Sequence, residues 1–421
     1  NCDDYGKLQL TVMLYDAATN TIVNADRVAL PKRTDLDKML TIDMGQEPGT
    51  LKEKLGNDLY KVRNLVVSGK INGDDLATLR DMVGCTDNKT PKLANLDLSA
   101  AQIVKGGVYM EDYELNIDDY LPDNVFEFAV SLRSIAVPGT LRSIGYAAFQ
   151  DTYSLREVTL NEGLEKIDTW AFASWNVESS LEKINIPSTV RSFEGTTFAS
   201  CYKLKDLVFH SDNPYYTFDG KAVYTKDYGQ IVHILPSYAG VLSLPDACRT
   251  VQWSSLRSGK LKGFVGKNVI EIGGHAFADL WSADYLAFGS KLKRVGIGPF
   301  SYARLNRLYL GCHDIPDGEY VDYVDGVYSD YWDAYKNVTL YVPRDAVDKF
   351  RKHRVWGMAK EVLPIEDTEF AYLADSELDA VDEVETSSTA MPHSIYSPTG
   401  VKLNRPIKGL NIVDGKKVMV K

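Results

Sequence analysis

A short phrase of the form Leu-x-x-Φ-x-Φ, in which Φ is an apolar residue, returns along most of the chain. It reads LRSIAV from Leu132, LREVTL from Leu155 and LEKINI from Leu181, and most copies are spaced 22 to 26 residues apart. A period of this length is typical of arrays in which each repeat is one supersecondary unit that buries its apolar side only by stacking on its neighbours. The period predicts an α/β repeat fold, a right-handed solenoid of short strands joined by turns and short helices.

Each repeat also contains a small residue followed by Phe. The two Φ residues alternate with polar ones, so a short strand directs them inward, and we expect the Phe to fill the interior of the next turn. The pairs are Ala148–Phe149, Ala171–Phe172, Thr197–Phe198, Ala276–Phe277 and the looser Pro299–Phe300. The five Phe are predicted to form one interior column through a solenoid of about eleven rungs.

The combined pattern resembles the BspA-type leucine-rich repeats of Bacteroides-group surface proteins. It is most complete at residues 186–204, IPSTVRSFEGTTFASCYKL, where Phe193–Glu194 replaces the family's Ile-Gly. The resemblance implies a leucine-rich repeat solenoid over residues 48–366, with a hairpin insertion at 213–236 and a C-terminal capping helix at about 344–357. The resemblance is highly specific for the fold. It is only weakly specific for the function, because one fold serves many functions.

The two ends of the chain lack the repeat. Residues 1–47 are predicted to form an N-terminal tether and a small β cap. Residues 367–392 are acidic and contain no Lys or Arg, which predicts a solvated linker. Residues 393–421 alternate in polarity around the turn signal Asp414–Gly415, which predicts a C-terminal β tail.

Composition excludes several classes of partner. The net charge is −11 with no compensating basic block, so we expect neither nucleic acid nor an anionic membrane surface as a partner. No apolar run approaches the ~18 residues of a membrane span. The five Cys form no CxxC pair, which argues against a disulfide framework or a zinc site. We expect no cofactor and no metal.

No catalytic motif is present, and we predict that the protein is not an enzyme. The chain has no P-loop, no GxSxG and no dinucleotide fingerprint after a predicted strand. The six His show no metal-binding spacing and are interpreted as surface or turn residues. Asp74 or Asp75 is interpreted as a helix N-cap rather than a calcium ligand, and Cys201 as a buried core thiol.

Cys2 is the candidate for lipid attachment. The chain begins NCDDYG, and exported lipoproteins of the lineage that the repeats resemble carry a lipidated Cys at the mature N-terminus, often followed by acidic residues. Asn1 departs from that pattern, because the preceding residue is usually small. We expect an exported protein whose signal has been removed, either anchored at the outer-membrane cell surface through lipid or secreted; an ordinary tether residue is the alternative for Cys2.

The candidate binding residues lie in the late repeats. The second and fourth residues after the first residue of each repeat phrase are expected to face outward, and in the last three repeats these positions collect Tyr285, Arg307, Tyr309 and Tyr341. Tyr and Arg are enriched in interface hot spots. We predict that the four side chains share one exposed strand face, with Tyr309 stacked on Tyr341 and Arg307 within cation–π reach of Tyr285. The other aromatic group belongs to the 213–236 hairpin: Tyr215, Tyr216 and Tyr224.

These observations favour a non-catalytic, adhesin-like protein, on the cell surface or secreted, that binds a macromolecular ligand through the solenoid. The ligand is a host protein or a glycan, and the oligomeric state stays open. The alternative is a glycan-binding surface lipoprotein, for which exposed aromatic rings would stack on sugar rings. A lone aromatic platform would indicate the glycan function, and a broad patch with a polar rim would indicate the protein function.

Overall fold

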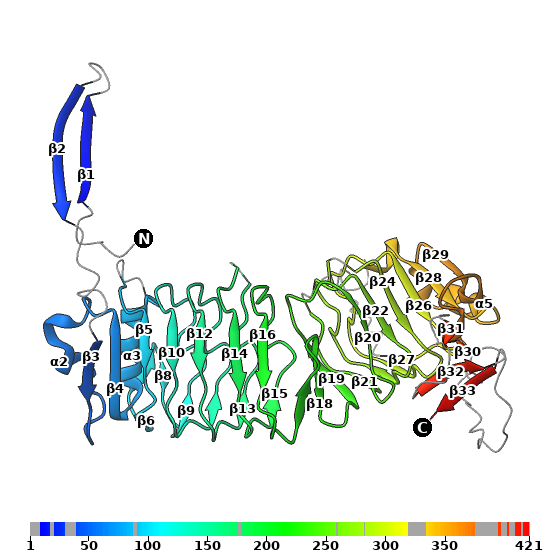
Figure 1. Ribbon diagram of the computed structural model, residues 1–421, viewed down its shortest axis with the longest axis horizontal. Coiled ribbons are helices and arrows are strands. Elements are labelled where there is room, and N and C mark those ends of the chain that lie inside the picture. Colours follow the sequence, from blue (N-terminus) through cyan, green and yellow to red (C-terminus); the bar gives the residue numbers. More distant parts are fainter. Residues whose placement is uncertain are drawn as a thin grey trace.

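The computed structural model is an elongated solenoid of short parallel strands (Figure 1). It has about 13 turns with a period of about 23 residues, two turns more than predicted. The residues described are 9–16, 21–29, 39–86, 91–175, 178–257, 260–281, 283–318, 334–374, 395–396, 402–403, 409–413 and 416–420.

The Leu-x-x-Φ-x-Φ phrases form one long side of the solenoid as two parallel sheets. The first contains β3 (Met39–Asp43), β4 (Asn64–Ile71), β5 (Asn95–Asp97), β10 (Ser134–Ala136), β12 (Glu157–Thr159), β14 (Lys183–Ile186) and β16 (Asp206–Phe209), with β6 (Ala101–Ile103) beside β4. The second contains β20 (Val241–Ser243), β22 (Gly263–Gly266), β24 (Tyr285–Phe288), β26 (Arg307–Leu310), β28 (Thr339–Val342) and β29 (Glu361–Pro364).

A second side of each turn carries shorter strands. These are β9 (Tyr120–Leu121), β11 (Ser143–Ile144), β13 (Lys166–Ile167) and β15 (Ser192–Phe193) in the first half. The second half has β17 (Tyr216–Phe218), β18 (Ala222–Thr225), β19 (Gln230–Ile234), β21 (Thr250–Val251), β23 (Glu271–Ile272), β25 (Arg294–Val295) and β27 (Asp317–Gly318).

Left-handed backbone turns repeat with the same period. Asn124, Ala147 and Trp170 all have φ between 52° and 59° and follow equivalent short strands. The N–H of Asn124 donates to Tyr146 O, and the N–H of Ala147 donates to Thr169 O, so each turn bonds to the next repeat. Stacking thus satisfies backbone groups that a single repeat would leave without partners.

The Phe side chains form two stacks rather than the single column predicted. In the first half, Phe149 lies 5.1 Å from Phe172, and Phe172 lies 5.4 Å from Phe198, between ring centroids. Phe126 extends this stack and was missed. Phe277 and Phe300 form the second stack, at 5.7 Å.

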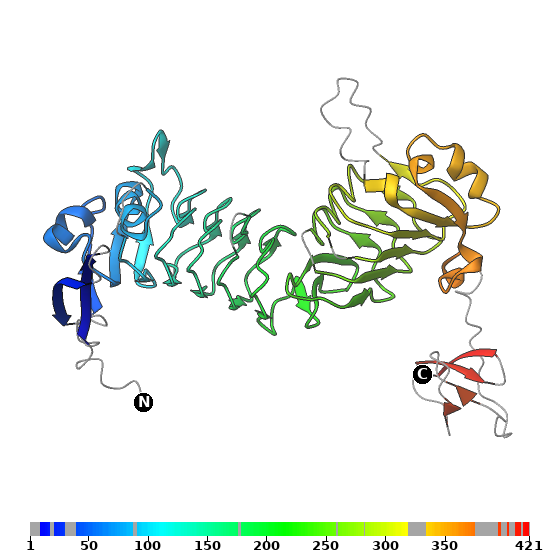
Figure 2. The ribbon, with the colours of Figure 1, turned by 90° about the horizontal axis from the view of Figure 1, so that it is seen from above.

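The column is interrupted because the hairpin insertion enters the core. The strands β18 and β19 are buried on both sides: Val223 and Val232 pack into the core of the first half, whereas Tyr224 and Ile231 pack into that of the second. The hairpin therefore acts as a wall between two cores. No strand pair joins β16 to β20, and Figure 2 shows the two halves of the array meeting at this point.

His233 on β19 lies in this wall, so the interpretation of every His as a surface or turn residue was wrong. Its side chain is 2% exposed, and its Nδ1 lies 2.6 Å from Gly195 O. Its ring centroid lies 5.9 Å from that of Phe198, so the stack of Phe rings in the first half ends on an imidazole. Burial lowers the pKa of His233 to about 4.

The N-terminal part joins the solenoid earlier than expected. The strand β3 pairs in parallel with β4, so the sheet begins at Met39. Before it, β1 (Gln9–Asp16) and β2 (Thr21–Ala29) form an antiparallel hairpin. The elements near the first turns are α2 (Leu51–Leu55), η2 (Gly56–Asp58), α3 (Gly73–Val83), β7 (Val108–Met110) and β8 (Tyr113–Glu114).

The N-cap of α3 is Asn72, not Asp74 or Asp75 as predicted. The Asn72 side chain accepts hydrogen bonds from the N–H groups of both Asp residues, and Asp75 accepts from the Asn72 N–H, which completes a capping box. Cys201 is a core thiol as predicted: it is fully buried and donates to Phe172 O.

The C-terminal cap consists of η3 (Ala334–Asn337), α5 (Val347–Lys352), η4 (Trp356–Met358), η5 (Ile365–Asp367) and η6 (Ala371–Leu373). Phe350 and Trp356 close the end of the second core. The tail forms an antiparallel sheet of β30 (Ile395–Tyr396), β31 (Lys402–Leu403), β32 (Gly409–Val413) and β33 (Lys416–Val420).

Candidate functional site

Tyr285, Arg307, Tyr309 and Tyr341, called here the tyrosine cluster, lie on adjacent strands as predicted. Tyr285 is in register with Arg307, and Tyr309 with Tyr341. The rings of Tyr309 and Tyr341 stack with centroids 4.6 Å apart. The Arg307 guanidinium lies 5.8 Å from the Tyr285 ring centroid, within cation–π distance.

The cluster is covered, so the prediction of an exposed face was wrong for its centre. After β29 the chain turns back, and residues 365–374, the closing segment, pack onto this sheet. The Phe370 ring centroid lies 4.5 Å from that of Tyr309 and 5.0 Å from that of Tyr285. Tyr309 is 1% exposed as a result, and the cluster is a small third core.

Polar contacts also fix the closing segment. Arg307 forms ion pairs with Asp284 and, at 3.6 Å, with Glu369 of the segment. Hydrogen bonds from Asn306 and Arg307 hold the pKa of Asp284 below its usual value. At the end of the segment, His313 Nε2 lies 3.3 Å from Ala374 O. The sequence did not predict the packing of the closing segment. Residues 367–392 are acidic, so Phe370 and Leu373 were included in the predicted linker.

The first half of the solenoid presents an open sheet face instead. The outward side chains of β10, β12, β14 and β16 are exposed or half-buried: Ser134, Ala136, Glu157, Thr159, Lys183, Asn185, Asp206 and Val208. Their register is as predicted, with Glu157 beside Lys183 and Lys183 beside Asp206. A hollow of about 220 Å³ lies on this face between Met39 and Thr159. The open sheet face is a broad surface of mixed charge.

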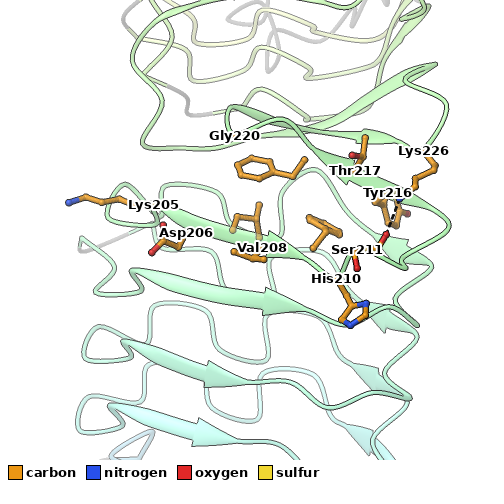
Figure 3. A pocket seen from close by; sticks show the side chains of 12 residues that line it. Lys205, Asp206, Val208, His210, Ser211, Tyr216, Thr217, Gly220 and Lys226 are labelled. Atoms are coloured by element: carbon orange, nitrogen blue, oxygen red, sulfur yellow. Dashed lines mark hydrogen bonds between the residues drawn. The ribbon is translucent and has the colours of Figure 1, made fainter.

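A groove of about 440 Å³ lies where this face ends (Figure 3). It is lined by residues 205–211 of β16 and its flanks and by Tyr216, Thr217, Phe218, Gly220 and Lys226 of the hairpin. The strand β16 pairs with β14 on one side and with no strand on the other. Of the hairpin tyrosines, Tyr215 is 46% exposed, Tyr216 lines the groove, and Tyr224 is fully buried.

The remaining candidates concern a metal site, a membrane span and lipid attachment. Within the described ranges, no group of three or more His, Cys, Asp or Glu side chains is placed to hold a metal ion. None of the helices in this part of the chain is both long and apolar enough to cross a bilayer. Cys2, the predicted lipidation site, lies outside the described residues, as does most of the predicted linker.

Comparison with solved structures gives likenesses of low sequence identity. The pneumococcal vaccine antigen PcpA is 16% identical, with 72% of this chain and 79% of that chain covered and a TM-score of 0.36. A leucine-rich repeat protein from Eubacterium ventriosum is 15% identical, with coverage of 71% and 78% and a TM-score of 0.45. A leucine rich cell surface protein from Faecalibacterium prausnitzii is 14% identical, with coverage of 88% and 98% and a TM-score of 0.44.

A family match falls on the first half of the solenoid. No curated protein matches the chain. Residues 119–228, however, match six copies of the BspA type Leucine rich repeat region. These residues include β9 to β18, the first stack of Phe rings and the left-handed turns at Asn124, Ala147 and Trp170. The chain thus folds as a parallel β-solenoid, and its residues 119–228 are similar to the BspA type Leucine rich repeat region.

Proposed function

We propose that this chain is an exported, non-catalytic binding protein whose open sheet face contacts a protein ligand at the cell surface. The observation that carries the proposal is the contrast between the two halves. The outward residues of β10 to β16 are open and of mixed charge, whereas the equivalent residues of β24 to β28 are packed under the closing segment. Exposed strand positions of a solenoid form its usual binding surface.

Export and anchoring are part of the same proposal. The resemblance of the repeats to BspA-type surface proteins supports export, and the two Asp residues that follow Cys2 support lipid attachment at Cys2. An adhesin-like role follows from a binding surface that is held outside the cell.

A matched pair of substitutions tests the open sheet face. Val208 and Val241 both face outward on repeat strands and are 48% and 45% exposed, the first at the open face and the second in the other half. For a protein identified on an extracellular-protein array, Val208→Glu is expected to weaken binding at least about tenfold, because it places an unpaired charge in the contact. Val241→Glu is expected to change affinity less than about twofold. Equal affinities of the two variants would place the ligand elsewhere.

A glycan ligand is the second candidate, and Trp253 favours it. The indole is 57% exposed and lies across Gly274, where a Cβ would come within 2.3 Å of the ring. Glycine at this position therefore leaves room for the indole, which also contacts the His275 ring at 5.2 Å and whose exposed part is a flat aromatic surface of the kind that stacks on sugar rings.

On a glycan array, Trp253→Ala is expected to lower the binding signal at least about tenfold, since the stacking platform is removed. Trp281→Ala is the matched control: Trp281 is 61% exposed, but Arg304 lies over its ring at 5.0 Å. A glycan signal that both variants retain would exclude Trp253 as the platform.

A further inference from the structure

Four cationic side chains meet in one pocket near the N-terminal end of the solenoid. The pocket has a volume of about 570 Å³ and is lined by Lys61, Arg63, Pro91, Lys92, Ala94, Val130, Ser131, Arg133 and Ser154. No acidic residue is among these lining residues. The described lining residues thus carry four positive charges and no negative one, in a chain whose net charge is −11.

The stacking of the repeats creates this basic pocket. Arg63 stands directly before β4 and Arg133 directly before β10, and Lys92 belongs to the turn before β5, which lies between those two strands. Neighbouring strands are ~4.8 Å apart, so the positive charges follow one another at short intervals along the edge of the solenoid. Arg156, directly before β12, continues this row beyond the pocket.

The pocket wall is held by buried contacts. Ser131 Oγ donates to Val83 O and Leu93 O, at 3.1 and 2.7 Å, which ties the turn before β10 to α3 and to the turn before β5. Pro91 and Val130 pack against Gly84, the left-handed C-cap of α3, and a Cβ there would come within 2.7 Å of both side chains. The backbone that carries the cations is therefore in place before any ligand arrives.

The four cations have no carboxylate partner among the described residues. Other arginines on the solenoid edges do: Arg142 and Arg191 both pair with Glu165, at 3.2 and 2.7 Å. Like charges held close together repel one another, and an anionic ligand would relieve this repulsion. Guanidinium groups also bind sulfate, phosphate and carboxylate through paired N–H donors.

The surroundings of the pocket narrow the class of anion. Among the described residues, no aromatic side chain lines it, whereas single-stranded nucleic acid sites combine positive charge with stacking rings. The strands β4, β5 and β10 are each paired on both sides, so no free edge is offered to an extended peptide. The pocket thus has cations at short intervals but offers neither stacking rings nor a free strand edge. Such a site fits a flexible polymer that carries anionic groups at intervals along its length.

We propose that this basic pocket binds a polyanionic glycan that carries sulfate or carboxylate groups. The inference rests on the proposed function, because such polymers lie outside the cell, and it assigns a separate site from the open sheet face and from Trp253.

The test is a titration of the full chain with a heparin octasaccharide at several NaCl concentrations. The double variant Arg63→Gln/Arg133→Gln is expected to lower the affinity at least about tenfold and to reduce the slope of log K against log salt by about two. The matched control Arg142→Gln/Arg191→Gln makes the same change in net charge on other repeats and is expected to alter the affinity less than about twofold. Arg133, Arg142 and Arg191 are exposed and Arg63 is half-buried, and thermal melts would verify that both variants fold.

Three results would overturn the proposal: equal heparin affinity of the two double variants, equal binding of an uncharged dextran of similar length by the wild type, or tighter binding of polyglutamate or oligo-dT of equal charge. The proposed function fails separately. Loss of the array partner in Val208→Glu, with heparin binding retained, supports the open sheet face and leaves the basic pocket intact. Heparin binding that depends on Arg63 and Arg133, without any array partner, supports the pocket and contradicts the protein-binding function.

Discussion

Replacing Phe172 with alanine is expected to lower the free energy of unfolding by about 3–5 kcal/mol, the usual cost of truncating a fully packed Phe. The Phe172 ring is 3% exposed and lies between those of Phe149 and Phe198, at 5.1 and 5.4 Å. Alanine would leave a cavity in the middle of the stack, and the neighbouring turns cannot close it because each is hydrogen-bonded to the next. Denaturant unfolding followed by circular dichroism measures the change.

Phe128→Ala is the control for this experiment. Phe128 belongs to the same series of turns but is 40% exposed, so its truncation is expected to cost less than about 1 kcal/mol. A loss below about 1 kcal/mol for Phe172→Ala as well would contradict the tight packing of the stack.

The second large effect concerns pH and His233. Because the folded protein buries the neutral imidazole, the pKa of His233 falls from 6.5 to about 4. The unfolded chain binds the proton from pH 6.5 downward and the folded one only near pH 4, so the contribution to stability is complete above 6.5 and is lost as pH falls toward 4. A pKa difference of this size between the unfolded and the folded state corresponds to a loss of unfolding free energy on the order of 3 kcal/mol.

A comparison of variants isolates the contribution of His233 from that of the carboxylates. His233→Phe removes the titrating group from the wall between the two cores, so its unfolding free energy is expected to change less between pH 7 and pH 4 than that of the wild type. His210→Gln alters an exposed His and is expected to keep the wild-type profile. Parallel pH profiles for wild type and His233→Phe would show that His233 does not titrate in this window.

The period of the chain could be predicted from its sequence because the same short pattern of apolar residues recurs in each repeat. Alternation within a strand decides which side chains face inward, and a slip of one residue would expose the whole apolar set. The register of Tyr309 with Tyr341 and of Tyr285 with Arg307 followed from the period, and the burial of Cys201 followed from its position in the repeat.

Contacts between distant segments were decided only by the tertiary structure. Phe370 covers Tyr309 because the chain reverses after β29, and no local pattern in an acidic stretch indicates a reversal. The hairpin became a wall rather than a surface insertion because both sides of β18 and β19 found apolar partners in separate cores, which also buried His233.

Exposure and charge grouping on the surface depend on the same long-range packing. Lys61, Lys92 and Arg133 are far apart in sequence, and the irregular spacing of the first repeats gave no sign that their turns are stacked neighbours. Alternation determined the inner and outer sides of the strands β10, β12, β14 and β16. Whether an outer side meets solvent, a ligand or another part of the chain depends on where distant segments fold back, since burial is a property of the assembled surface and not of any one repeat.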